Sequence, residues 1–380
     1  MIVKNFYGWR ILAAGFLILI LDGGVRFSFG VLIKPLSSEF SWDRSAITFA
    51  YTLNMMIFGL CQPLAGKLLD RFGPRFLFPI AALITAAGLV LTSQIKSIFE
   101  LYVYYGVITG IGVSGMSIGV ISSTLSRWFM SLRGFVSGVA ISGTALGQFL
   151  LIPLLALLMG RFGWRWAWFI LAVLLCLMVI PISLVVMKKE PSDVGQDAYG
   201  SGTEDKRERI DPLPEDSSGS IPQAICSRNY LLTAATYFIC GFQDYLFVTQ
   251  LIPFVTDKGL TTQEASNLQG FAGLTSIVGL LFIAALSEKV GRKIPLFLTF
   301  LPRFVCFGLL LISSRRPFLY TSALLFGFAH MASAPLTAAL IGDLYGLKNI
   351  GTLTGTIFWI HQTGGALGAY LGGIIYDLTN

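Results

Sequence analysis

A short charged segment recurs between long apolar runs of the chain, and this recurrence constrains the fold more than any other feature. The first copy, Gly66–Arg75, reads GKLLDRFGPR, and a weaker copy, Ser287–Lys293, reads SEKVGRK. In both copies an acidic residue precedes a glycine by three positions. The flanking runs reach the length of about 20 residues that a membrane-spanning helix needs. The pattern therefore predicts two related halves built from membrane helices.

The composition agrees with a membrane location. The chain is 54% hydrophobic and 12% charged, with a mean hydropathy of +0.73, which excludes an ordinary soluble domain. The apolar runs are continuous rather than alternating, so helices are favoured over a β-barrel. The five cysteines are scattered and indicate neither disulfides nor a metal centre. The net charge of +7 comes from basic residues in short loops between the runs. There it indicates how the chain is oriented in the membrane and not nucleic-acid binding.

Apolar runs separated by Gly, Pro and charged breaks predict eleven helices. In the first half they lie near residues 9–33, 45–65, 76–94, 100–125, 134–158 and 164–187. In the second half they lie near residues 230–253, 266–286, 294–313, 318–341 and 350–374. The polar segment 188–228 is predicted to be a flexible cytoplasmic link between a half at 1–187 and a half at 229–380.

The distribution of Lys and Arg predicts the orientation. More of them fall on the side of the amino terminus, so this side is expected to be cytoplasmic. Short external loops without an Asn-x-Ser/Thr acceptor fit a bacterial inner membrane. Because the second half has five helices against six in the first, we expect the sequence to be a fragment that lacks a last helix, with an unusual eleven-helix protein as the alternative.

Several motifs carry a family resemblance. The segment GKLLDRFGPR at 66–75 matches the G-x-x-x-D-R-x-G-x-R loop of the major facilitator superfamily. The segments YGWR at 7–10, RFSFGV at 26–31, RGFVSGVAISG at 133–143 and HQTGGALG at 361–368 resemble the branch of monocarboxylate transporters and oxalate:formate antiporters. The resemblance implies an all-α membrane fold with two six-helix halves and a cavity lined by helices one, seven, ten and eleven.

One position departs from the branch. Its members carry a substrate-binding arginine in helix eight, shortly before the acidic residue of the second motif, and alignment on Glu288 puts Leu280 there. Arg303 belongs to span nine, which the resemblance places at the periphery. Arg26 is then the candidate for the positive charge that binds a substrate carboxylate.

Six strongly polar titratable residues fall near the middle of predicted spans, where a charge costs about 2.5 to 3.5 kcal/mol on insertion scales. They are Asp22, Arg26, Asp244, Arg303, His330 and His361. Asp22 and Arg26 are four residues apart and share a helix face. We expect Arg26 to bind the substrate anion and Asp22 to take part in proton coupling, with a permanent structural ion pair as the alternative.

The sequence gives weaker support to the other candidate residues for proton coupling and substrate binding. Asp244 has no oppositely charged partner in its own helix, and burial of such a carboxylate favours its neutral form, so it is a candidate proton carrier. Asp257 matches an acidic position of the branch and is a second candidate, or else a solvated loop residue. His361 and His330 are candidate substrate ligands, with structural hydrogen bonds as the alternative, and Arg303 is interpreted as structural. No metal site is predicted from two histidines without a third ligand.

The charged motif is expected to act in gating, because its side chains can bond to neighbouring helix ends in one conformation and release them in another. The gating candidates are Gly66, Asp70, Arg71, Gly73, Arg75, Glu288 and Arg292. Glycines four apart, such as Gly364, Gly368 and Gly372, predict close helix packing.

These observations favour a secondary transporter that moves a small organic anion, a monocarboxylate such as lactate or pyruvate, with protons by alternating access. Exchange of organic anions, or transport of an uncharged or amphiphilic solute, is the alternative. No nucleophile–base pair or phosphate-binding loop is visible, so neither an enzyme nor an ATP-driven pump is predicted, and no cofactor is expected. The expected partners are the anion, protons and the lipid bilayer, and we expect a monomer.

Overall fold

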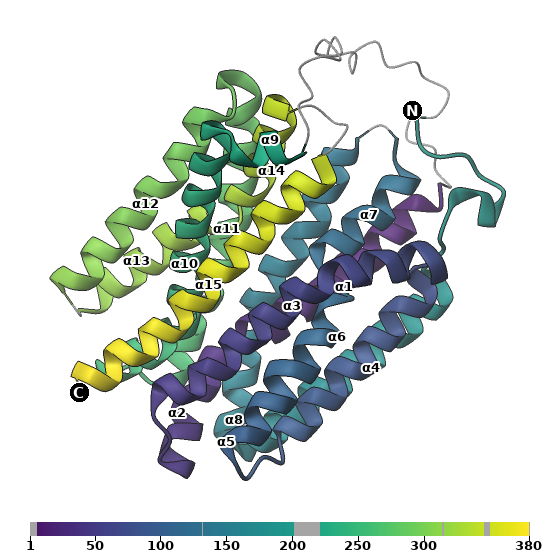
Figure 1. Cartoon of the computed structure of the whole chain (residues 1–380). Coiled ribbons are helices and arrows are strands. Elements are labelled where there is room, and N and C mark those ends of the chain that lie inside the picture. The colour runs from purple at the N-terminus through teal and green to yellow at the C-terminus, as the bar shows by residue number, and fades with distance from the viewer. Residues whose placement is uncertain (1–5, 131, 201–220, 314, 346–349, 380) are drawn as a thin grey trace.

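The computed structural model describes residues 6–130, 132–200, 221–313, 315–345 and 350–379. Within these ranges the chain is helical, apart from turns and one isolated bridge between Phe129 and Tyr199. The helices form two groups that lie side by side, purple to teal for the first half and green to yellow for the second (Figure 1). The all-α fold with two halves is thus as predicted.

The bounds of the elements follow the apolar runs. The first half contains α1 (Gly8–Phe27), α2 (Phe29–Phe40), α3 (Arg44–Phe72), α4 (Pro74–Thr92), α5 (Ile98–Leu101), a π-helical segment (Tyr102–Thr109), α6 (Gly110–Ser114), α7 (Ile118–Trp128) and α8 (Arg133–Val186). The second half contains α9 (Ile221–Cys226), α10 (Arg228–Asp257), α11 (Thr262–Val290), α12 (Lys293–Ile312), α13 (Arg316–His330), α14 (Ser333–Tyr345) and α15 (Ile350–Thr379). Nine helical stretches of the described chain are long and apolar enough to cross a membrane; they include Gly134–Val186 as one stretch and do not include α15.

The long helix α8 is two helices joined at Gly163. Its φ of 80° and ψ of 163° are accessible only to glycine. The helix after the break begins at Trp164, whose indole donates to Glu39 at the end of α2. It ends near Lys188, whose carbonyl accepts a hydrogen bond from Trp128, at the end of the bundle where α8 begins. The chain therefore reverses direction at Gly163, and the predicted helices 134–158 and 164–187 are both present.

The two copies of the charged motif have the same backbone geometry. Gly73 ends α3 with φ 75° and ψ 168°, and Gly291 ends α11 with φ 79° and ψ −179°. In the first copy, residues 66–72 are the last turns of α3, Gly73 alone forms the break, and Pro74 and Arg75 begin α4. We call the end of the bundle that holds these glycines the motif end.

A second feature repeats between the halves. In the first half, one membrane-crossing segment is interrupted between the end of α6 at Ser114 and the start of α7 at Ile118. In the second half, the corresponding segment is interrupted between the end of α13 at His330 and the start of α14 at Ser333. At the motif end each half is tied by an ion pair, Asp70 with Arg127 in the first and Arg292 with Asp343 in the second. The acidic and basic partners are exchanged between the two copies, so the repeat preserves the contact and not the charge order.

The start of the expected flexible link is ordered. Residues 188–200 pack against the first half, with a short 3₁₀ turn at Pro191–Val194. The backbone of Tyr199 exchanges hydrogen bonds with Trp128 and Met130, and Gln196 accepts one from the Tyr7 backbone. Aromatic packing against Phe6 and Trp9 explains this order. Residues 201–220 lie outside the described ranges.

Candidate functional site

Close contact between α10 and α15 positions the polar centre of the second half. A Cβ atom on Gly241 of α10 would lie 2.0 Å from the His361 carbonyl oxygen, and one on Gly364 of α15 would lie 2.2 Å from the Phe238 oxygen. Gly368 approaches Phe242 in the same way. The packing predicted from the glycine spacing of α15 is therefore confirmed, and it brings His361 within reach of α10.

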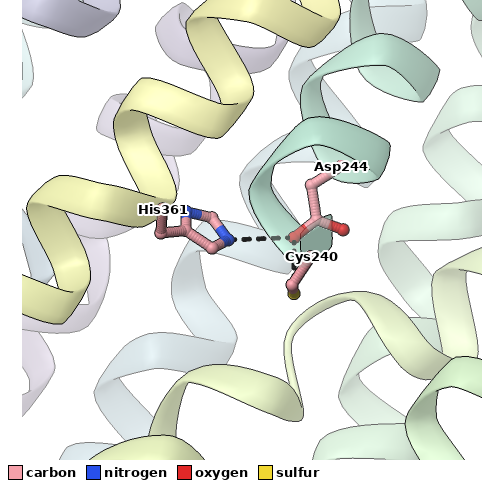
Figure 2. Close-up of side chains that lie close together, drawn as sticks. All are labelled: Cys240, Asp244 and His361. Atoms are coloured by element: carbon pink, nitrogen blue, oxygen red, sulfur yellow. Dashed lines mark hydrogen bonds and ion pairs between the residues drawn. The ribbon is translucent and has the colours of Figure 1, made fainter. Parts of the chain in front are cut away.

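Asp244 lies at the centre of this region. Figure 2 shows the His361 ring of α15 pointing at the Asp244 carboxylate of α10, with Cys240 beside it. His361 Nε2 lies 3.3 Å from Asp244 Oδ2, and the Cys240 thiol donates to the same oxygen at 3.6 Å. On the other side, Asp244 Oδ1 lies 3.0 Å from Arg303 Nη1 and 4.0 Å from His330 Nε2. The structure thus brings together both predicted histidines and one predicted aspartate.

Arg303 differs from its expected place at the periphery. Its side chain is fully buried, and it donates to the carbonyl oxygens of Ala329 and His330 at 3.1 and 3.2 Å. These carbonyls are at the end of α13, where helix hydrogen bonding stops. Arg303 therefore caps the broken end of α13 and supplies the positive charge for Asp244 that α10 itself lacks. Its structural interpretation agrees with these contacts.

The side chains around Asp244 include a thiol and an imidazole, so the group must be compared with a metal-binding site. The ligand atoms of Cys240, Asp244 and His361 all lie within 4.8 Å of one another, and thiolate, carboxylate and imidazole are zinc ligands. However, Arg303 Nη1 lies 3.0 Å from the Cys240 sulfur and 3.0 Å from the carboxylate. This guanidinium already neutralises the carboxylate and would repel a second cation, so we interpret the group as a hydrogen-bonded ion pair.

The predicted pair in the first half has a looser geometry. Asp22 is fully buried, and its Oδ2 lies 3.9 Å from Arg26 Nη1, which is beyond hydrogen-bond distance. Neither Asp22 oxygen has a hydrogen-bond partner among the described residues. An ionised carboxylate in this setting lacks the donors that normally compensate for lost hydration. The contact between Asp22 and Arg26 is therefore electrostatic and not a hydrogen bond.

Arg26 connects the two halves. Its Nη2 donates to the Tyr245 hydroxyl of α10 at 2.8 Å, and its guanidinium carbon lies 4.2 Å from the centre of the Phe58 ring. Tyr245 in turn packs edge-on against His361, with ring centroids 6.0 Å apart. A continuous path of side chains therefore leads from Arg26 through Tyr245 and His361 to Asp244.

Asp257 lies at the end of the bundle opposite the motif end. Its carboxylate bonds to Lys34 Nζ of α2 at 2.7 Å and to Arg44 Nη2 of α3 at 2.7 Å. Nearby, the backbone of Arg44 donates to Asp377 of α15, and its guanidinium lies 3.4 Å from the Tyr376 ring centre. These contacts all join the first half to the second. Asp257 is thus part of an ionic contact between the halves, not a solvated loop residue.

The motif residues lie far from the central side chains. Asp70 forms an ion pair with Arg127 at the end of α7, whereas Arg71 lies over the ring of its neighbour Phe72. Gly66 has open space around it, and Arg75 is exposed. Arg292 contacts Asp343 and Ser287. The Glu288 side chain lies outside the described part of the structure. Leu280 is buried in α11, and its apolar side chain offers no charge to a substrate.

Three polar residues of this region are not among those predicted from the sequence: Cys240, Tyr245 and Gln362. Cys240 is one helical turn before Asp244, and this spacing could have singled it out. Tyr245 and Gln362 directly follow Asp244 and His361. Only the arrangement of the helices reveals that Tyr245 contacts Arg26 and that Gln362 is buried.

Comparison with known proteins agrees with this architecture. The family model described as Major Facilitator Superfamily matches residues 15–266 and 233–380. The chain belongs to this superfamily. Its family and fold are those of membrane transporters, and it is an integral membrane protein.

Relatives in the superfamily span nearly the whole chain. The uncharacterized MFS-type transporter YcxA of Bacillus subtilis (strain 168) is 27% identical over 98% of this chain and 89% of its own length. Monocarboxylate transporter 12 of Xenopus laevis is 25% identical over 98% of this chain and 83% of its own length. Both relatives are therefore similar across both halves, although distant in sequence.

Solved structures of superfamily members share the fold. A bacterial homolog of the human lysosomal transporter Spinster superposes with a TM-score of 0.76 at 14% identity, covering 99% of this chain and 84% of that one. A D-xylose–proton symporter gives a TM-score of 0.69 at 15% identity, covering 96% and 89% of the two chains. The two-half arrangement of the superfamily is thereby established for this chain.

Proposed function

We propose that this superfamily member is a secondary transporter that moves a small organic anion, a monocarboxylate, together with a proton. The observation that carries the proposal is the pair of Asp22 and Arg26, buried at the contact between the halves and not hydrogen-bonded to each other. The name of monocarboxylate transporter 12 supports the same substrate class.

The proposed coupling follows from competition for one guanidinium. When Asp22 is ionised, it neutralises Arg26 and opposes the approach of a second anion. When Asp22 is protonated, Arg26 keeps an uncompensated positive charge in a buried environment, where an unpaired charge is costly. A substrate carboxylate removes this cost by binding Arg26. Anion and proton therefore bind together and are released together.

The remaining candidates receive different roles in the proposal. Asp244 stays ionised because Arg303 and His361 contact it, so it holds the central charges in place and does not carry the proton. The two histidines are proposed to lie behind the residues that face the substrate. His361 packs against Tyr245, and His330 packs edge-on against Phe27, with ring centroids 5.6 Å apart. Asp22 is the one proton carrier among the three predicted aspartates.

Asp257 and the motif residues are proposed to act in alternating access. The ion pairs that join the halves among the described residues involve Asp257, at the end opposite the motif, while the described ion pairs at the motif end stay within one half. This arrangement corresponds to a state closed at the Asp257 end. Opening there requires Asp257 to release Lys34 and Arg44, and the motif pairs then control the other end.

We further propose that the protein lies in a bacterial inner membrane with its amino terminus and its motif end in the cytoplasm, and that it works as a monomer. The distribution of Lys and Arg supports the orientation. In this orientation the described state is closed to the outside.

The test is uptake of labelled lactate, pyruvate, acetate, formate and oxalate by the purified protein in liposomes, with and without an inward proton gradient. We expect gradient-stimulated uptake of at least one monocarboxylate, with accumulation up to about tenfold for a gradient of one pH unit, because one proton per anion transfers about 1.4 kcal/mol. Uptake that ignores the gradient and depends on an internal anion would identify an exchanger instead. Absence of uptake of every acid would refute transport of small organic anions.

A further inference from the structure

The guanidinium of Arg26 lies between two acceptors that come from different halves of the protein. Its Nη2 donates to the Tyr245 hydroxyl of α10 at 2.8 Å, whereas its Nη1 stays 3.9 Å from Asp22 Oδ2. Asp22 and Arg26 are four residues apart in α1, a spacing at which a carboxylate and a guanidinium can form a hydrogen-bonded ion pair. Arg26 is nevertheless hydrogen-bonded to the neutral hydroxyl of the other half and not to the carboxylate of its own helix.

Tyr245 can restrain Arg26 because its own ring is held in place. The ring is buried, and a Cβ atom on Gly365 of α15 would lie 2.0 Å from its Cδ2 atom, so α15 lies directly against it. The rings of Tyr51 and His361 also pack against it, with centroids 5.9 and 6.0 Å away. A hydroxyl on a closely packed ring has little freedom to follow the guanidinium, so this hydrogen bond holds Arg26 toward α10.

The gap between Arg26 and Asp22 is small enough to close. A charge-assisted hydrogen bond between a guanidinium and a carboxylate has a length of about 2.8 Å, so Nη1 would have to move only about 1 Å closer to Oδ2. Neither Asp22 oxygen has a hydrogen-bond partner among the described residues, and an ionised carboxylate would be stabilised by this approach. Loss of the Tyr245 hydroxyl would remove the hydrogen bond that opposes it.

We propose that Tyr245 is a positioning residue that keeps Arg26 from closing onto Asp22, so that the guanidinium stays available to the substrate carboxylate. The inference rests on the proposed function, in which Asp22 and the substrate compete for Arg26. A closed ion pair would hold Asp22 in its ionised form and occupy the donors that the anion needs. The restraint by Tyr245 therefore favours the binding of both the proton and the anion.

The test is a double-mutant cycle of anion binding, measured by calorimetric titration of the purified protein at one fixed pH. The probes are the five acids of the uptake assay, and the cycle uses the one that binds the parent protein most tightly. Tyr245→Phe removes only the hydroxyl, and we expect it to weaken binding about tenfold because Arg26 closes onto Asp22. In the presence of Asp22→Asn, which leaves no carboxylate to close onto, we expect the same substitution to change the affinity less than about twofold.

Tyr51→Phe is the matched control. Tyr51 is a buried tyrosine beside Tyr245, and its hydroxyl donates to the backbone carbonyl of Arg26 at 3.2 Å and not to the guanidinium. We expect this variant to bind the anion with an affinity close to that of the parent protein, with and without Asp22→Asn.

Two results would overturn the inference alone. An equal loss of affinity from Tyr245→Phe with and without Asp22→Asn would show that Tyr245 acts on the substrate or on the fold and not through Asp22. An undiminished affinity of Tyr245→Phe would show that its hydroxyl does not restrain Arg26. Failure of the parent protein to bind any of the five acids, or of Asp22→Asn to bind the acid that the parent binds, would remove the proposed function and the inference with it.

Discussion

Replacement of Arg26 by alanine is expected to lower anion uptake about 100-fold or more while the protein remains folded and inserted. Arg26 is buried, is bonded to the other half through Tyr245, and keeps a donor, Nε, that has no hydrogen-bond partner among the described residues. Its removal leaves Asp22 without the guanidinium beside it, and a carboxylate there does not attract an anion. The change is measured as the initial rate of uptake at a fixed amount of protein per liposome.

Two further variants make the result specific. Arg26→Lys keeps the charge but loses the planar arrangement of donors, so uptake should fall less than in Arg26→Ala. Arg10→Ala removes an exposed arginine from the same helix, and we expect uptake close to that of the parent protein. Uptake by Arg26→Ala at the parent rate would remove Arg26 from the substrate site.

Replacement of Asp244 by alanine is expected to destabilise the protein by about 3 to 5 kcal/mol. Arg303 is fully buried, and without Asp244 its charge is paired with no other carboxylate of the described residues. Stabilities of folded domains are only about 5 to 15 kcal/mol, so a large fraction would be lost. The effect should appear as a lower midpoint of thermal unfolding in detergent and as a smaller monodisperse peak in size-exclusion chromatography.

The double variant Asp244→Asn, Arg303→Met separates the charge effect from other damage. Replacement of both partners of a buried ion pair by neutral groups is often close to neutral, so we expect the double variant to be more stable than Asp244→Ala. Glu39→Gln breaks the exposed pair with Arg165 and should cost about 1 kcal/mol or less. A double variant no more stable than the single one would show that Asp244 does not act through Arg303.

The sequence predicts the architecture well because the relevant signals are local. Apolar runs of helical length, breaks at Gly and Pro, and the recurrence of the charged motif follow from one stretch of chain at a time. The turn at Gly73 and its counterpart at Gly291 share one backbone geometry, as the recurrence indicates. The break at Gly163 lies between the predicted helices 134–158 and 164–187, so the sequence predicts it as well.

Side-chain pairing between helices is less accessible to sequence analysis. Nothing local to Asp244 indicates that its partner is Arg303, which belongs to a helix expected at the periphery. The same applies to Tyr245, whose hydrogen bond with Arg26 depends on how the two halves meet. In contrast, the spacing of Asp22 and Arg26 was enough to predict that they share a helix face, and the structure places them 3.9 Å apart.

Asp257 illustrates how context changes the interpretation of a charge. From the sequence it was a candidate for proton coupling or a solvated residue at the end of a helix. The structure surrounds it with Lys34 and Arg44 from the other half. Because these contacts join the two halves, we propose that Asp257 belongs to a contact that opens and closes during transport.

The number of protons taken up per anion bound tests the central claim most directly. It can be measured by calorimetric titration of the purified protein with its acid substrate at about pH 8, in two buffers of different ionisation enthalpy. We expect about one proton per anion for the parent protein and none for Asp22→Asn, which should still bind the anion because Arg26 has lost its counter-charge. Anion binding by the parent protein without proton uptake, or equal proton uptake by Asp22→Asn, would contradict the account.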